Sequence, residues 1–200
     1  MNDVYLNGIA QCSPIYSHNS FGEDFYSLEV SVMRTSGVAD CIPCILPSHI
    51  ADGITQGQSL YMNGEIRTTY KMDDSGKSHM KVYFFAKELC EGLFEENTNL
   101  VVLDGYICKE PILRQTPSGK IICDLHIACE RGAVRKSDYI PCICGGGKAV
   151  LASQFDVGTK IWLQGRFQSR DYLKKIDGKV ETRRTYEVSV SHYRILDLED

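Results

Sequence analysis

Hydrophobic and polar residues alternate with a period of two along several stretches of this chain. In residues 123–129, Cys, Leu, Ile and Cys alternate with Asp, His and Ala, and similar alternation runs through residues 26–32 and 161–167. A period of two is typical of antiparallel strands that bury one face. The segments 73–77 and 177–179 carry the Asp, Ser and Gly residues of tight turns, and predict hairpins. The pattern therefore predicts an all-β fold.

The strand pattern occurs twice because the chain contains an internal repeat. The sequence Asn-x-Val-x-Leu-x-Gly at residues 2–8 recurs at residues 99–105, an offset of 97. The block that begins at Asp40 recurs at Asp138, an offset of 98, with Ile-Pro-Cys-Ile in both copies. Because the offset changes only between matched blocks, the insertions fall in predicted loops. Other matched positions are Pro14 with Pro111, Leu28 with Leu125, Arg34 with Arg131, Gly57 with Gly158 and Gly64 with Gly165.

Each copy contains the elements of an OB-fold. About five strands are predicted in each, with a short helix at 48–55 and 147–155 between the third and fourth strands. A long hairpin joins the fourth strand to the fifth. Gly64 and Gly165 lie inside strands, where glycine suits the sharp bends of a small barrel. The predicted architecture is two tandem five-stranded OB-fold barrels.

The charges divide unevenly between the two copies. We place the first OB-fold at 1–91, a connector at 92–98 and the second OB-fold at 99–200. Residues 1–97 carry 6 Lys and Arg against 13 Asp and Glu, a net charge of −7. Residues 98–200 carry 16 against 13, a net charge of +3. The overall charge of −4, which on its own argues against a nucleic-acid partner, therefore averages an acidic copy and a basic copy.

Composition narrows the class of protein further. The chain has 200 residues, of which 43% are hydrophobic and 24% charged, so collagen, coiled coil and wholesale disorder are excluded. No apolar run reaches the roughly 18 residues of a membrane helix, and the N-terminus does not resemble a signal peptide. We expect a cytoplasmic protein without a membrane partner.

Nine cysteines are many for a chain without a secretory signal. Zinc is one interpretation, because Cys41 and Cys44 form a C-x-x-C and Cys142 and Cys144 a C-x-C. These cysteines lie in apolar runs that are typical of strands rather than of the paired knuckles of structural zinc sites. The pattern favours free, buried thiols in a reducing compartment. We expect no metal and no cofactor.

Several motifs of the second copy occur in an order and spacing found in a known family. They are Asn99-Leu-Val-Val-Leu-Asp-Gly105, Pro111-Ile-Leu-Arg114-Gln-Thr116-Pro-Ser-Gly119-Lys120, Ala128-x-x-Arg131, Asp138-Tyr139-Ile140-Pro141-Cys142, Val157-Gly158, Gly165-Arg166-Phe167-Gln168-Ser169-Arg170-Asp171-Tyr172 and Tyr186-Glu187-Val188. From Asn99 to about Ile195, the second copy resembles the bacterial single-stranded-DNA-binding protein family. The first copy keeps the skeleton of this pattern but fewer of the surface residues. The resemblance implies OB-folds that bind single-stranded DNA without strong sequence preference and without catalysis.

The residues of the second copy supply what such binding requires, which is a basic groove for phosphates and aromatic faces for bases. Seven basic side chains lie between Arg166 and Arg184, around the predicted hairpin of the fourth and fifth strands. By charge alone, this hairpin could equally be a solvated edge, and the resemblance favours DNA. The candidate DNA-binding residues are Tyr139, Tyr172, Tyr70, Arg114, Lys120, Arg131, Arg135, Lys136, Lys148, Arg166, Arg170, Lys174, Lys175, Arg183 and Arg184.

Aromatic residues are the second requirement. By the resemblance, Tyr139 and Tyr172 stand where the family carries base-stacking aromatics, while ordinary half-buried packing is the alternative for both. Tyr70 lies near the equivalent of Tyr172 in the first copy. Trp162, the single tryptophan, has an outward phase that suits a subunit interface better than a DNA contact.

The C-terminal sequence departs from the family. Replication-type members end in a long tail with an acidic, apolar-tipped peptide that recruits partner proteins. Here residues 196–200 follow the last predicted strand directly, so recruitment of such partners is in doubt. This suggests a phage-type, mobile-element or accessory primosomal relative.

The sequence thus predicts a non-enzymatic single-stranded-DNA-binding protein, whose second copy is the main binder. From the family we expect a homodimer that presents four OB-folds. The alternative is an interaction module whose acidic first copy docks on a partner protein. A nuclease has the least support, because no cluster of metal-binding carboxylates is visible.

Overall fold

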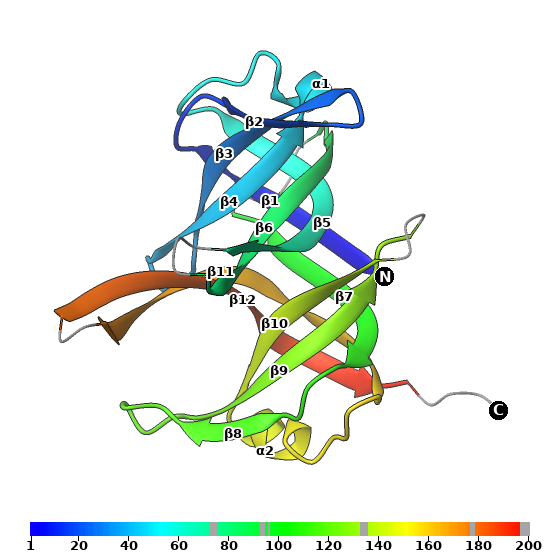
Figure 1. The fold of residues 1–200 in the computed structure, drawn as a ribbon, viewed down its shortest axis with the longest axis vertical. Helices are drawn as coiled ribbons and strands as arrows, with labels where there is room; N and C mark the ends of the chain where they lie inside the picture. The colour runs from blue at the N-terminus through cyan, green and yellow to red at the C-terminus, as the bar shows by residue number, and fades with distance from the viewer. Residues whose placement is uncertain (73–75, 93–94, 96, 133–135, 177–178, 197–200) are drawn as a thin grey trace.

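Two β-rich units follow one another along the longest axis of the molecule (Figure 1). The computed structural model describes residues 1–72, 76–92, 95, 97–132, 136–176 and 179–196, without the side chains of residues 174–176 and 179. The first unit contains β1 (Asn2–Ala10), β2 (Ile15–Ser20), β3 (Glu23–Met33), β4 (Ala39–Pro47), α1 (Ser48–Ala51), β5 (Ser59–Met72) and β6 (Ser78–Leu89). The second contains β7 (Asn99–Ile107), β8 (Ile112–Gln115), β9 (Ile121–Glu130), β10 (Ser137–Gly145), α2 (Gly147–Ala152), β11 (Lys160–Ile176) and β12 (Lys179–Ile195).

Each unit is a closed barrel of five strands. In the first, β1 pairs with both β3 and β5, and the parallel pairing of β4 with β6 closes the ring. In the second, β7 pairs with β9 and β11, and β10 pairs in parallel with β12. The helices α1 and α2 lie between the third and fourth barrel strands, as the sequence predicts. The predicted pair of OB-fold barrels is therefore confirmed.

Each barrel also has a short strand that the alternation did not predict. β2 pairs with one edge of β3, and β8 pairs with β9 in the same way. Both strands are mostly exposed, so neither has an apolar face to produce a period of two. They widen the sheet next to the second barrel strand.

Two glycines allow the long strands to bend around the barrels. The register of β5 against β6 shifts between Asn63 and Gly64, and that of β11 against β12 shifts between Gln164 and Gly165. A Cβ atom on Gly64 would collide with the carbonyl oxygen of Phe85, and one on Gly165 with that of Ser189. Only glycine fits this close approach of backbones, which confirms the prediction from the strand pattern.

The two barrels are joined through their first strands. β1 and β7 pair in antiparallel fashion. Val4 and Val101 occupy equivalent positions in the two repeats, and they are also paired with each other across the two strands. The register is therefore symmetric about this pair, and the two repeats are related by an approximate two-fold axis. This pairing joins all the strands into one 12-stranded sheet.

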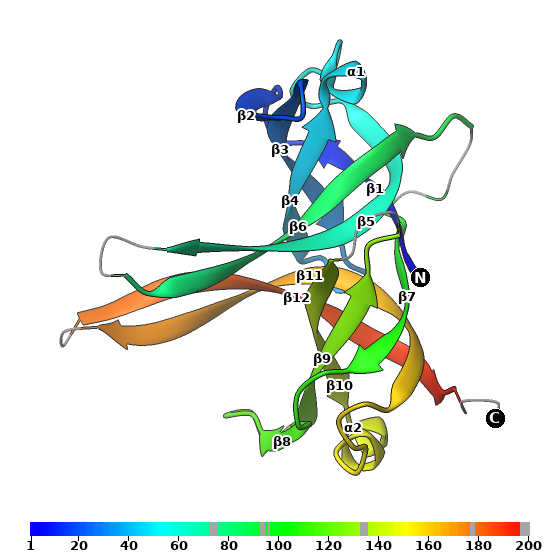
Figure 2. The ribbon, with the colours of Figure 1, turned by 45° about the vertical axis from the view of Figure 1, so that its right-hand side comes forward.

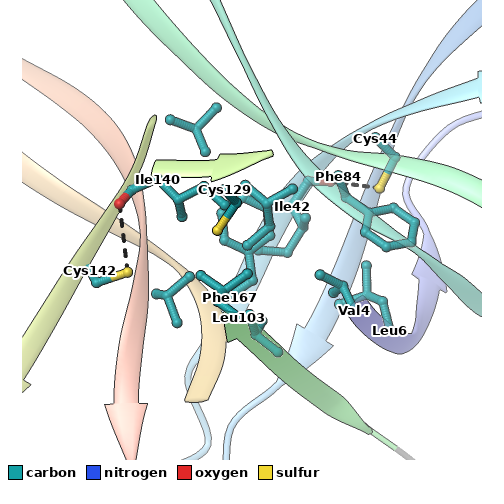
Figure 3. Close-up of a cluster of buried hydrophobic side chains, with 14 of the residues drawn as sticks. Val4, Leu6, Ile42, Cys44, Phe84, Leu103, Cys129, Ile140, Cys142 and Phe167 are labelled. Carbon is teal, nitrogen blue, oxygen red and sulfur yellow. Dashed lines mark hydrogen bonds between the residues drawn. The ribbon is translucent and has the colours of Figure 1, made fainter. Parts of the chain in front are cut away.

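The hydrophobic core continues from one barrel to the other. Figure 3 shows Val4, Leu6 and Phe84 of the first repeat near Leu103 and Phe167 of the second. All five side chains are fully buried. Burial of apolar surface stabilises by about 25 cal/mol per Å², so separating the repeats would expose part of this core at a large cost.

The cysteines belong mainly to this core. Cys44, Cys142 and Cys144 are buried, whereas Cys41 is half-buried. Because Cys41 and Cys44 stand three residues apart on β4, their side chains lie on opposite sides of the strand. Burial raises the pKa of the Cys144 thiol to about 12, which keeps it protonated at neutral pH. The described part of the chain contains no cluster of three His, Cys, Asp or Glu side chains that could hold a metal ion.

Neither of the described helices is long and apolar enough to cross a membrane.

Candidate nucleic-acid interface

A groove runs between the first barrel and the long hairpin of the second, and we call it the inter-repeat groove. Its volume is about 930 Å³. The first repeat contributes residues of β2, β3, β4, β5 and β6, and the second contributes residues of β11 and β12. The residues that line it are Cys12, Ile15, Ser17, His18, Ser27, Leu28, Glu29, Pro43, Cys44, Ile45, Thr69, His79, Met80, Lys81, Val82, Tyr83, Tyr172, Arg183, Arg184, Thr185 and Tyr186.

Strand length explains how the second repeat reaches this groove. β11 and β12 are 17 residues long, whereas the other strands of the second barrel have at most 10. At ~3.3 Å per residue, strands of this length extend roughly 55 Å, well beyond the barrel that they help to close. Figure 2 shows the β11–β12 hairpin beside the β5–β6 hairpin on one side of the molecule. β12 also contacts β6.

The hairpin carries three of the predicted residues into the inter-repeat groove. Tyr172 is 37% exposed and lies on β11, and Arg183 and Arg184 lie on β12. The Nε of Arg184 donates to Asp171 Oδ1 at 2.7 Å, and the Nη2 of Arg183 lies 3.4 Å from Glu181. Both ion pairs are well exposed, and exposed pairs hold their partners weakly. A phosphate can therefore compete with these carboxylates for the guanidinium groups.

A smaller groove, of about 530 Å³, lies within the second repeat, and we call it the second-repeat groove. It contains three predicted residues, Arg114, Lys120 and Arg170. Arg114 binds Asp124 through Nε and Nη2, and Arg170 binds the buried carboxylate of Glu187 at 3.1 and 3.2 Å. The groove is lined by Arg114, Thr116, Pro117, Lys120, Ile122, Ile143, Cys144, Gly145, Gln168, Arg170, Glu187 and Ser189.

The structure places Arg131 at the junction of the repeats. Its Nε and Nη2 bind the buried carboxylate of Asp138 at 2.7 and 2.6 Å, and Nη2 also donates to the carbonyl oxygen of Thr68 at 2.9 Å. Asp138 Oδ1 accepts a hydrogen bond from the backbone N–H of Thr68 at 2.6 Å. Arg131 thus connects the two barrels, which leaves it fewer donors for phosphate.

The repeat equivalents of these residues form a matching cluster. Asp40 accepts hydrogen bonds from Arg34 and from the backbone N–H of Ser169, the second at 2.8 Å. Arg34 Nη2 donates to the carbonyl oxygen of Ser169 at 2.9 Å. Burial would raise the pKa of Asp40, but the hydrogen bonds from Arg34 and Ser169 outweigh it and hold the pKa below its usual range. The predicted residue Arg166 adds a contact of 3.3 Å to this carboxylate.

The other predicted residues lie around these sites. Tyr139 on β10 is 40% exposed, and its backbone N–H donates to Thr68 Oγ1 on β5, the strand that carries the exposed Tyr70. Lys148 on α2 donates to the carbonyl oxygen of Ser191. Lys136 is exposed just before β10. Arg135 and the side chains of Lys174 and Lys175 lie outside the described part of the structure, as do the predicted turn tips at 73–75 and 177–178.

Sequence reasoning missed the junction residues and most of the inter-repeat groove. The matching of Asp40 with Asp138 and of Arg34 with Arg131 was a signal for the junction, because polar residues kept in both copies serve a shared purpose. No comparable signal marked His18 or Tyr83, which are ordinary strand residues until the barrels are placed together. Tyr186 was marked only as part of the family motif Tyr186-Glu187-Val188.

Comparison of the sequence and the fold with known proteins identifies a protein family. Residues 98–196 match the model of the single-strand binding protein family. The second repeat belongs to this family. The match covers the range from Asn99 to about Ile195 that the sequence motifs indicated, and the family is one of non-enzymatic DNA-binding proteins.

Relatives of known sequence in the family match the chain over 87 residues. Single-stranded DNA-binding protein 2 of Listeria innocua serovar 6a is 34% identical, over 40% of this chain and 54% of its own. The single-stranded DNA-binding protein of Oceanobacillus iheyensis is 33% identical, over 40% of this chain and 53% of its own. The chain spans about half the length of the curated relatives it matches.

Solved structures show the family fold over both repeats. The wild-type single-stranded DNA binding protein from Thermus aquaticus superposes with a TM-score of 0.77 at 20% identity, and covers 100% of this chain and 95% of its own. A deletion mutant of the same protein gives a TM-score of 0.73 at 21% identity, with 100% and 96% covered. The first repeat therefore keeps the family fold, although only the second matches the family model.

Proposed function

We propose that the chain binds single-stranded DNA by stacking bases on tyrosines and by holding phosphates with the basic side chains of the second repeat. One observation supports this proposal: arginine, lysine and tyrosine residues of the second repeat, which matches the family model, line grooves on both barrels. Arg114, Lys120 and Arg170 supply charge to the second-repeat groove. Neutralisation of phosphates by such groups releases counterions and makes binding salt-dependent.

Tyr139 and Tyr172 are the proposed stacking residues. Tyr139 is 40% exposed and Tyr172 is 37% exposed, and Tyr172 also lines the inter-repeat groove. Stacking on an aromatic residue contributes about 1–3 kcal/mol per base, which is about a fivefold to hundredfold effect on affinity. Because every base has an aromatic face, such a site tolerates any sequence.

Titration of labelled oligo-dT, followed by fluorescence anisotropy at low and high salt, tests this function. We expect binding that weakens steeply as salt rises. Tyr139→Ala and Tyr172→Ala should each lower affinity about tenfold at low salt. The matched control is Tyr106→Ala, because Tyr106 is 39% exposed and is not one of the predicted DNA-binding residues.

Two results would contradict the proposal. Affinity weaker than the high micromolar range at low salt would exclude DNA binding as the function and favour the interaction module. An equal loss of affinity in Tyr106→Ala would exclude specific stacking on Tyr139 and Tyr172.

We also propose that two chains associate to present four barrels. The proposal is supported by aromatic residues on β1, β5 and β11 whose side chains are only half-buried in the single chain. Tyr5 stacks on Tyr61 with ring centroids 6.4 Å apart, and Arg194 lies 5.2 Å over the ring of Trp162. Light scattering should give twice the mass of the chain. A monomeric mass at micromolar concentration would exclude the assembly.

A further inference from the structure

The 12-stranded sheet ends in two free edges. β2 is its first strand and β8 its last, and each pairs with a single neighbour among the described strands. Figure 1 shows these two strands toward opposite ends of the longest axis of the molecule. The backbone N–H of Thr116 donates to the carbonyl oxygen of Lys120. Because hydrogen bonds alternate along an antiparallel pair, the N–H and C=O groups of Leu113 and Gln115 point away from β9. Another strand can pair with such an edge.

Both edge strands lack the features that usually prevent such pairing. Natural proteins protect free edges with charged residues and with proline. β2 contains neither, and β8 contains one charged residue, Arg114, which is bound to Asp124 of its own chain. Each edge strand begins instead with two exposed apolar residues: Ile15 (62%) and Tyr16 (57%) in β2, and Ile112 (60%) and Leu113 (45%) in β8. The edges are therefore suited to pairing with another chain.

Phe21 lies at the tip of the hairpin that joins β2 to β3, and it is fully exposed. Its φ is 52°, and that of the following Gly22 is 83°. A positive φ is unfavourable for a bulky residue, and asparagine followed by glycine is the favoured pair in such a turn. Since the ring is not buried in its own chain, the fold gains nothing from it that would offset this cost. An exposed phenylalanine held in a strained turn points to a contact with another molecule.

The two edge hairpins carry opposite charges at equivalent places in the repeat. Residues 15–24 contain two carboxylates, Glu23 and Asp24, and no Lys or Arg, whereas residues 112–121 contain Arg114 and Lys120 and no Asp or Glu. Glu23 and Lys120 are both exposed, and they are equivalent at the repeat offset of 97. Two hairpins of the same kind would repel each other, and two of different kinds would attract.

From these observations we infer that β2 of one chain pairs with the β8 edge of a second copy, with Phe21 as an apolar anchor, so that copies join end to end. The opposite charges of the two hairpins select this arrangement over β2 with β2 or β8 with β8. A contact between two different surfaces of identical chains leaves one surface free at each end of the assembly, so the array stays open. This contact differs from the proposed association of two chains through the rings of Tyr5, Tyr61 and Trp162, and it does not require DNA.

Sedimentation velocity of the full chain without DNA, over a range of protein concentrations, tests the inference. The reference is the species present at low concentration, whether it holds one chain or two. We expect larger species at about 100 μM, because an edge of four to six residues buries less than the ~1,200 Å² of a stable interface. Their mass should keep rising with concentration and should fall when salt is added, since the attracting charges are exposed.

Phe21→Asn tests the apolar anchor without weakening the fold. It should raise the concentration needed for the larger species about tenfold, which is typical of the loss of a central aromatic contact. Because asparagine suits this turn, the thermal midpoint should stay equal or rise. The matched control is Val38→Asn: Val38 is 56% exposed and lies between β3 and β4, at the opposite end of β3 from Phe21. This variant should assemble as the wild type does.

Exchange of the charges tests which ends meet. Glu23→Lys and Lys120→Glu should each raise the concentration needed for the larger species about fivefold, because each places like charges at the contact. The double variant Glu23→Lys/Lys120→Glu makes the two ends opposite again and should restore assembly. Glu91→Lys is the control, since Glu91 is exposed and lies outside both hairpins. It should change assembly by less than about twofold.

Four outcomes would overturn the inference. A wild type that stays at its low-concentration mass would show that the edges do not pair. Equal effects of Phe21→Asn and Val38→Asn would remove Phe21 from the contact. Failure of the double variant to restore assembly would exclude pairing of unlike ends, and larger species that stop at twice the reference mass would assign the contact to two like edges. Binding of oligo-dT is measured separately, so each of these results leaves the proposed function standing.

Discussion

Asp138→Asn is the substitution that tests most directly how the two barrels are joined. Asp138 is fully buried, and its carboxylate binds Arg131 of its own repeat and Thr68 of the other. Asparagine has nearly the same shape, so it can keep one oxygen toward the N–H of Thr68. Its amide nitrogen then faces the Nε of Arg131, where a donor meets a donor.

The cost of this substitution follows from the contacts that are lost. A hydrogen bond to a charged group contributes about 1.5–3 kcal/mol, and removal of one partner from a fully buried ion pair costs about 3–5 kcal/mol. The side chain of Arg131 is 21% exposed, so water replaces part of the lost contact. We expect a loss of about 2 kcal/mol in the free energy of unfolding, which is about 30-fold in the unfolding equilibrium.

Urea unfolding followed by two probes measures both the loss and its location. Far-UV circular dichroism reports on both barrels, whereas fluorescence of the single tryptophan, Trp162, reports on the second. We expect coincident transitions in the wild type and, in Asp138→Asn, a lower midpoint with separated transitions. Asp171→Asn is the control, because it removes a carboxylate from an exposed ion pair and should change the midpoint little. An unchanged midpoint in Asp138→Asn, equal to that of the control, would refute the role of Asp138 in joining the barrels.

Two further predictions concern the barrels themselves. Because the pKa of Asp40 is lower in the folded chain than its ordinary 3.8, its contribution to stability is present above pH ~4 and is lost as the pH falls through the folded-state value. The fall in urea midpoint between pH 5 and pH 3 should be smaller in Asp40→Asn than in the wild type, and an equal fall would contradict this. Gly165→Ala should lower the free energy of unfolding by about 1–3 kcal/mol, because its Cβ would collide with the backbone of Ser189. Gly147→Ala, which meets no atom within 4 Å, should lower it less, and equal thermal midpoints for the two would exclude the collision.

The barrels were predictable from the sequence because their signals are local. Alternation along residues 123–129 marks a strand wherever that segment lies, and Gly165 interrupts its strand at the bend. Because the sequence repeats, each strand predicted in one copy was supported by the equivalent strand in the other. The strands β2 and β8 escaped prediction because an exposed edge strand has no buried face and therefore no period.

The candidate site was less predictable because it depends on how the barrels meet. Arg183 and Tyr172 were identifiable as a basic and an aromatic residue on a long hairpin. The barrel that they face depends on the pairing of β1 with β7, which brings together residues 93 or more positions apart in the chain. Arg131 looked like a phosphate ligand because its partner, Asp138, could not be recognised as buried from its sequence neighbours.

The two-fold symmetry of the β1–β7 pairing has a consequence for the path of a bound strand. DNA has a direction, from 5′ to 3′, and a two-fold axis reverses direction. A strand that crosses both barrels in a straight line therefore meets the second one with the opposite polarity from the first. To meet both barrels with the same polarity, the DNA strand has to turn back on itself between them. The barrels must therefore either bind DNA in both polarities or bind a strand that forms a loop.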